Sequence, residues 1–189
     1  VDGIRAAAPA ADYSPAFVND VLATPFPYPP PTMFLLLPFG WWNMQTAASV
    51  WYALNGVALL AAVTLLWRLF APGSGALGFL LVAALVMSFR PMQSTIELAQ
   101  WNALALLAVL LFWRDQGRAL AGVWLGAAFF LRTFLVALLI HPIRRGAWRT
   151  VATAGATIGG LTALAVAAFG ATTCATYLGT VSEGFLPLV

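Results

Sequence analysis

Several residue types that build common functional sites are scarce in this chain. It contains one cysteine, Cys174, and one histidine, His141. A single cysteine excludes an intrachain disulfide, and one cysteine with one histidine cannot supply the ligands of a structural zinc site. The sequence also has no nucleophile elbow, phosphate-binding loop or glycine-rich dinucleotide motif. It therefore predicts neither a metal site nor a cofactor.

Charged residues are few, and lysine is missing altogether. They make up 8% of the 189 residues, whereas 62% are hydrophobic and the mean hydropathy is +0.90. A soluble domain carries about a quarter charged residues. The basic residues are nine arginines, most of them in short loops, and no basic face of the kind that binds nucleic acid is visible. The composition predicts an integral membrane protein with lipid, and not nucleic acid, as a partner.

Apolar runs separated by short polar breaks predict an all-α, polytopic helical bundle. Because a bilayer needs about 20 apolar residues, we predict four full spans at 47–67, 76–89, 103–113 and 150–169, the third beginning with a turn at 96–101. Residues 90–102 are predicted to be a polar loop. Residues 1–31, which are polar and proline-rich, are predicted to be an external loop, and residues 32–189 to be the transmembrane bundle. Within the bundle, 32–39 is too short to cross and fits an interfacial helix.

Arg132 interrupts the apolar stretch 119–140. A charge there is costly in lipid, so it is expected to face a partner, water or a ligand. If this stretch crosses the membrane once, three loop arginines lie inside and five outside. If it turns back at Arg132, six lie inside and two outside, which agrees with the positive-inside rule. We therefore predict a short helical hairpin at 119–143 that holds Arg132 in an outward-facing cavity.

Four stretches carry a family resemblance. Residues 12–17 read DYSPAF and residues 24–31 read TPFPYPPP, while residues 94–102 read STIELAQWN. Residues 121–132 form an apolar run that ends in Arg132, where lysine is usual, and are followed by RRGAWR at 144–149. Together these stretches resemble glycosyltransferase family 87, a family of bacterial, mannosyltransferase-like membrane enzymes of the GT-C superfamily.

The resemblance implies transfer of a hexose, typically mannose, from a polyprenyl-phosphate donor to a glycolipid or glycan outside the bacterial inner membrane. The N-terminal loop would then lie outside. A carboxylate of this loop would act as general base on the acceptor hydroxyl, and arginines would neutralise the departing phosphate without a metal. The family's aspartate is expected upstream of Val1, and Asp2 is the candidate within the chain. Because the chain begins without methionine, we expect an N-terminal fragment that lacks its first helix and is inactive alone.

The candidate residues for binding the donor phosphate or sugar are Arg132, Gln100, Asn102, Arg90 and Tyr28. Each also has a structural interpretation. Arg132 could bind carbonyl groups at the helix break, and the two amides could link helices by hydrogen bonds. Tyr28 could belong to an interfacial aromatic belt. Arg90 could form an ion pair with Glu97.

Two other functions remain open from the sequence. One is a subunit of a lipid or small-solute transporter or flippase, in which broken helices and buried charges would line a translocation path. The other is a membrane scaffold that keeps Arg132 buried against a fixed partner. The pairs Gly122 with Gly126 and Gly155 with Gly159 are spaced for close helix packing under any of these functions.

Overall fold

The chain is all-helical where the structure describes it. This structure is a computed structural model that describes residues 28–97 and 100–185, and no strand occurs within these ranges. The prediction of an all-α fold is therefore confirmed for the described residues. Residues 28–177 form one compact unit. The predicted boundary between an external loop and a bundle at residue 31 stays a prediction.

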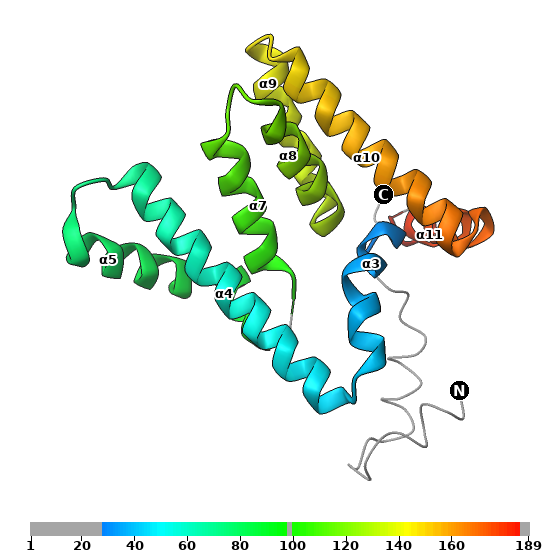
Figure 1. The fold of residues 1–189 in the computed structure, drawn as a ribbon, viewed down its shortest axis with the longest axis horizontal. Helices are drawn as coiled ribbons and strands as arrows, with labels where there is room; N and C mark the ends of the chain where they lie inside the picture. The colour runs from blue at the N-terminus through cyan, green and yellow to red at the C-terminus, as the bar shows by residue number, and fades with distance from the viewer. Residues whose placement is uncertain (1–27, 98–99, 186–189) are drawn as a thin grey trace. The chain divides into compact units, whose positions relative to one another are not determined.

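Short helical segments lead into a set of longer helices. The first elements are the 3-10 helix η1 (Pro30–Thr32), α3 (Met33–Leu36), the 3-10 helix η2 (Leu37–Trp41), α4 (Met44–Phe70), α5 (Gly75–Ser88) and α6 (Arg90–Glu97). They are followed by α7 (Asn102–Arg114), α8 (Ala119–Leu131), the 3-10 helix η3 (Thr133–Leu139), α9 (Ile140–Arg144), α10 (Trp148–Phe169) and α11 (Ala171–Phe185). Helix α7 packs between α4 and α8, and α8 packs between α7 and α10 (Figure 1).

Two helices, α4 and α10, are long and apolar enough to cross a membrane. Helix α4 has 27 residues and starts where the Asn43 side chain accepts a hydrogen bond from the backbone N–H of Thr46 at 2.9 Å, which caps its first turn. Helices α5 and α7 have 14 and 13 residues and rise only about 20 Å, against a hydrocarbon core of about 30 Å. The two long helices support a membrane protein, and the number of full spans stays a prediction.

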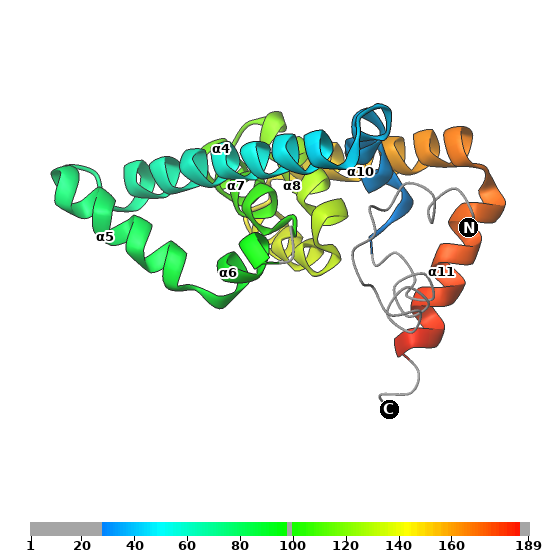
Figure 2. The ribbon, with the colours of Figure 1, turned by 90° about the horizontal axis from the view of Figure 1, so that it is seen from below.

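The break predicted at Arg132 is present in the structure. Helix α8 ends at Leu131, Arg132 has an extended backbone with φ −151° and ψ 104°, and η3 follows at once. The limb formed by η3 and α9 packs back along α8, so that Leu138 and Leu139 contact a buried cluster that includes Leu125. In Figure 2 this limb (yellow) and α6 lie on the same side of the unit, opposite α4 and α10.

The loops that flank this hairpin meet at one end of the bundle. A guanidinium nitrogen of Arg145, Nη1, donates to Oε1 of Gln116 at 3.3 Å. The Thr150 hydroxyl donates to the backbone carbonyl of Arg118 at 3.4 Å. Loops 114–118 and 144–149 therefore share one end, which we call the arginine-rich end, while Arg132 lies at the opposite end of α8. This arrangement is the one that the hairpin predicts, and a single crossing would separate the two loops.

Glycines allow α8 and α10 to pack closely. A Cβ atom placed on Gly122 would overlap the Thr150 carbonyl oxygen and the Thr153 hydroxyl of α10, and one on Gly126 would lie 2.7 Å from the Cβ of Thr157. The other predicted pair, Gly155 and Gly159, has open space on its Cβ side within the described residues. Close packing between helices of the bundle thus uses the first pair, on α8.

The prediction of a polar loop at 90–102 is wrong for most of its length. Residues Arg90–Glu97 form helix α6, and α7 starts only at Asn102, so residues 96 and 97 belong to α6 and not to a first turn of α7, while residues 98–99 of the predicted turn lie outside the described residues. Pro91 stands in the first turn of α6, where its missing N–H costs no helical hydrogen bond. Residues 32–39 were predicted to be a short helix, and they are helical. They comprise the last residue of η1, the whole of α3 and the first three residues of η2.

Candidate functional site

Arg132 is held at the helix break by two side-chain amides. Its Nε donates to Oδ1 of Asn102 at 3.0 Å, and its Nη2 donates to the same oxygen at 2.6 Å. Nη2 also donates to Oε1 of Gln100 at 2.7 Å. These bonds join the C-terminal end of α8 to the N-terminal end of α7. They fix the guanidinium plane, and among the described hydrogen bonds none runs from the Arg132 side chain to a backbone carbonyl.

Asn102 is the centre of this arrangement. Its Nδ2 donates to the backbone carbonyl of Pro91 at 2.8 Å and to Oε1 of Gln100 at 3.1 Å. All four hydrogen-bonding positions of an asparagine side chain are thereby used, two as acceptor and two as donor. Because Pro91 lies in α6, Asn102 links α6, α7 and the end of α8. These hydrogen bonds of Asn102 hold the three elements together.

An aromatic cluster packs against the polar network. The Tyr28 ring lies under the guanidinium carbon of Arg132, with 5.8 Å between this carbon and the ring centroid. Tyr28 also contacts the buried Trp101, with ring centroids 5.2 Å apart, and Trp101 packs against Trp51 at 4.8 Å. Burial raises the pKa of the Tyr28 phenol, and the positive charge of Arg132 acts in the opposite direction. The phenol is therefore neutral at physiological pH.

The positive charge of Arg132 has no carboxylate partner among the described residues. Its hydrogen-bond acceptors are neutral amides, which orient the guanidinium without neutralising it. The ion pairs of the described chain lie at the arginine-rich end, where Asp115 pairs with Arg114 at 2.8 Å and Arg118 at 3.6 Å. The described hydrogen bonds of Arg132 also leave both N–H groups of Nη1 unused. The site can therefore bind an anion.

Four of the candidate residues lie together in the structure. Arg132, Gln100 and Asn102 share the hydrogen bonds above, and the Tyr28 ring contacts the guanidinium. Arg90 is not joined to them by the hydrogen bonds described here, since its Nη1 donates to Oε1 of Gln93 at 3.4 Å. Asp2 lies outside the described residues, and so does the Glu97 side chain. A role for Asp2 as base and an ion pair between Arg90 and Glu97 stay predictions.

Sequence reasoning missed two parts of the site. The Pro91 carbonyl accepts from Asn102, and Trp101 supplies the buried surface beneath Tyr28. The proline next to Arg90 could have been recognised as a first-turn helix residue, whereas nothing local in the sequence pairs Trp101 with Tyr28. The cavity predicted beside Arg132 also stays a prediction. The open pocket seen in the described chain lies on η3 and α9, toward the arginine-rich end.

Metal binding has no support in the described chain. Within residues 28–97 and 100–185, no three histidine, cysteine, aspartate or glutamate side chains gather where they could hold an ion. The cationic group of the site is supplied by Arg132, with amide oxygen acceptors and an aromatic face around it. Such a site favours an anionic ligand over a cation.

These features define a helical protein with apolar, membrane-length helices and a cationic site at a helix break. The sequence profile described as glycosyltransferase family 87 matches residues 26–184, a range that includes Tyr28, Gln100, Asn102 and Arg132. The chain belongs to glycosyltransferase family 87, which indicates a glycosyltransferase and, with the two apolar helices, a membrane protein. It has no significant match among curated proteins or among solved structures.

Proposed function

We propose that the site at Arg132 binds the phosphate of a polyprenyl-phosphate sugar donor. The enzyme would transfer a hexose, with mannose as the proposed sugar, to a glycolipid or glycan outside the bacterial inner membrane. Family membership supports the reaction class. The donor class is supported by the site, because a lipid-linked phosphate can reach a guanidinium at the end of an apolar hairpin more readily than a water-soluble nucleotide sugar can.

One observation carries this proposal: a guanidinium oriented by neutral partners. Asn102 and Gln100 bind Nε and Nη2 of Arg132 and leave Nη1 for a ligand. Charge-assisted hydrogen bonds from arginine to phosphate are stronger than bonds between neutral groups. In transfer, the bond between the sugar C1 and the phosphate oxygen breaks, and negative charge grows on this oxygen. A hydrogen-bond donor that is already in position before the reaction stabilises that charge without a reorganisation cost.

The proposed orientation places the Arg132 end of the bundle outside and the arginine-rich end inside. Loops 114–118 and 144–149 contain five of the nine arginines, and cytoplasmic loops are enriched in such residues. Helix α8 has 13 residues and rises about 20 Å, so Arg132 would lie below the outer surface. Non-helical backbone at this depth is tolerated where it packs on protein or lines a cavity. The N-terminal loop would then face outward.

The transporter alternative differs in its requirement for a path across the bilayer. In a transporter, Arg132 would alternate between two sides, whereas the amide network ties it to α7 and α6. The family match also favours group transfer. We therefore propose sugar transfer as the function. The test compares a sugar carried by polyprenyl phosphate with the same sugar carried by a nucleotide.

Sugar transfer in membranes tests the proposal directly. Membranes that contain the full-length protein are supplied with polyprenyl-phosphate mannose or with a nucleotide mannose, and labelled glycolipid is measured after extraction. We expect label from the polyprenyl donor and none from the nucleotide sugar when polyprenyl-phosphate mannose synthesis is blocked. Direct transfer from the nucleotide sugar under this block would contradict the proposed donor.

A further inference from the structure

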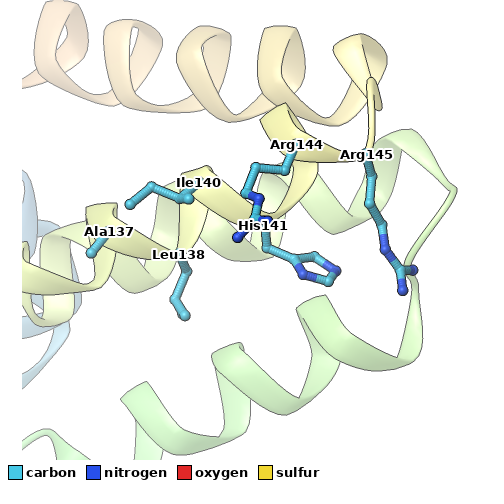
Figure 3. Close-up of a pocket in the computed structure, with 6 residues that line it drawn as sticks. All are labelled: Ala137, Leu138, Ile140, His141, Arg144 and Arg145. Carbon is cyan, nitrogen blue, oxygen red and sulfur yellow. The ribbon is translucent and has the colours of Figure 1, made fainter.

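An open pocket of about 590 Å³ lies on the return limb of the hairpin, away from Arg132. Its lining comes from η3, from α9 and from the residue after α9: Ala137, Leu138, Ile140, His141, Arg144 and Arg145 (Figure 3). The lining is thus apolar toward η3 and cationic toward the loop at 144–149. This division matches an amphipathic ligand whose anionic end meets the arginines.

The cationic end of the pocket is not neutralised by the described residues. Loops 114–118 and 144–149 hold five arginines and one acid, Asp115, a net charge of +4. The Asp115 carboxylate is buried and already receives hydrogen bonds from Arg114 and from Nε1 of Trp124. Arg145 donates to a neutral amide, Oε1 of Gln116. An anion at this place would meet positive charge that has no other partner in the described chain.

Two buried nitrogen atoms in the same region also lack hydrogen-bond partners among the described residues. They are Nε2 of His141, which lines the pocket, and Nε2 of Gln116, whose amide holds Arg145. The His141 ring is held in place by Trp113, with ring centroids 5.1 Å apart. Buried polar atoms are almost always paired in folded proteins. These two unsatisfied atoms mark a polar environment beside the pocket.

The apolar side of the pocket continues onto exposed hydrophobic surface. Ile140 is 59% exposed, and Phe134 and Val136, which precede it on η3, are exposed as well. Trp148, at the start of α10, is 65% exposed, and tryptophan concentrates where membrane meets water. An acyl chain could therefore lie along η3 while its headgroup stays level with Trp148.

We propose that this pocket binds one anionic glycerophospholipid from the leaflet at the arginine-rich end. The lipid phosphate contacts Arg144 and Arg145, and an acyl chain packs on Ala137 and Ile140. Basic pockets between membrane helices are known to hold anionic headgroups. This site is separate from the donor site, because the two lie toward opposite ends of the hairpin, and it does not rest on the proposed transfer reaction.

Native mass spectrometry of the purified protein tests this site. Protein extracted with equal amounts of phosphatidylglycerol and phosphatidylethanolamine is expected to retain phosphatidylglycerol preferentially. The double variant Arg144→Gln with Arg145→Gln should reduce this preference about tenfold. The matched double variant Arg118→Gln with Arg149→Gln removes two charges from the same end but outside the pocket, and should preserve most of the preference.

An uncharged variant separates the pocket from diffuse surface charge. Ala137 is exposed, and Ala137→Trp fills the pocket without changing the charge of the protein. This variant should lower the preference for phosphatidylglycerol with little effect on the melting temperature. An equal loss of the phosphatidylglycerol preference in the two double variants, or full retention of this preference in Ala137→Trp, would overturn the proposed site. Complete displacement of phosphatidylglycerol by excess inorganic phosphate would also overturn it, because the ligand would then be a soluble phosphate. If the arginine double variant does not fold, Ala137→Trp decides the outcome.

Discussion

Arg132 and Asn102 are 30 positions apart in the sequence, and two nitrogen atoms of the arginine donate to one oxygen atom of the asparagine, at 3.0 Å and 2.6 Å. This contact connects the end of α8 with the start of α7. It orients a cation while leaving its charge uncompensated among the described residues. The contact is what makes the helix break a candidate site instead of a simple turn.

Replacing Asn102 by aspartate tests whether the free charge of Arg132 matters. Asn102→Asp would place a carboxylate against Arg132 and neutralise it, so binding of polyprenyl phosphate should fall about 10-fold or more. Asn102→Ser, which removes the amide without adding charge, should weaken binding less. Equilibrium binding with a fluorescent polyprenyl phosphate measures both, and tighter binding by the aspartate variant would argue against the role of charge.

The Tyr28 ring contacts the guanidinium of Arg132. A cation–π contact contributes about 0.5–2 kcal/mol, so Tyr28→Ala should weaken donor binding about 2- to 30-fold. Tyr28→Phe keeps the ring and should bind like the wild type. The same binding assay applies, with the melting temperature as a control for packing against Trp101. Equal losses in both variants would assign the effect to the hydroxyl.

Gly122 and Gly155 form a matched pair for testing helix packing. Gly122→Ala would place its Cβ against α10 and should destabilise the bundle by about 1–3 kcal/mol. Gly155→Ala meets open space and should be neutral, or stabilising by up to about 1 kcal/mol through helix propensity. Thermal unfolding in detergent compares the two. A larger loss for Gly155→Ala would show that α10 uses its other face for packing.

The buried carboxylate of Asp115 should make the stability of the protein depend on pH in the acidic range. Hydrogen bonds from Arg114 hold its pKa below the ordinary value of 3.8, and the Trp124 indole acts in the same direction against burial. Because the folded pKa is lower than the unfolded one, the stabilisation is complete above about pH 4 and is lost as pH falls through the folded pKa. Asp115→Asn should lower the melting temperature by several degrees at pH 7.

The pH series gives the decisive comparison for Asp115. The difference in melting temperature between wild type and Asp115→Asn should be constant above about pH 5 and should shrink below about pH 4. The control is Arg149→Gln, an exposed substitution in the first turn of α10 at the same end, which should leave the pH series unchanged. A melting-temperature difference between the wild type and Asp115→Asn that grows toward low pH would contradict an ionised Asp115 in the folded protein.

The sequence predicted the helix break more successfully than the surroundings of the site. A single charge within 119–140 and the count of loop arginines were enough to place the turn at Arg132, because lipid penalises a charge strongly. Helix α6 was missed, since its polar composition was interpreted as a loop despite the first-turn proline. Sequence alone also could not tell which glycine pair faces a partner, because both pairs have the same spacing.

The grouping of Arg132 with Gln100, Asn102 and Tyr28 depends on tertiary packing. The predicted topology placed these residues on one side of the membrane, but their contacts require α7 to lie beside α8 and the entry segment to reach Trp101. Arg90 was included by the same reasoning, its described hydrogen bond is to Gln93, and its role at the site stays a prediction. Rotation of a helix about its axis is set by packing, which the apolar pattern of α7 and α8 does not specify because both are hydrophobic all round.

Binding of polyprenyl phosphate to Arg132→Ala is the most direct measurement of the central claim. The matched control is Arg118→Ala, which removes one charge at the other end of α8, and the melting temperature of each variant reports folding. Loss of hydrogen bonds to a charged phosphate corresponds to about 1.5–3 kcal/mol, so Arg132→Ala should bind at least about 10-fold more weakly, with Arg118→Ala unchanged. Wild-type affinity in a folded Arg132→Ala variant would contradict the account.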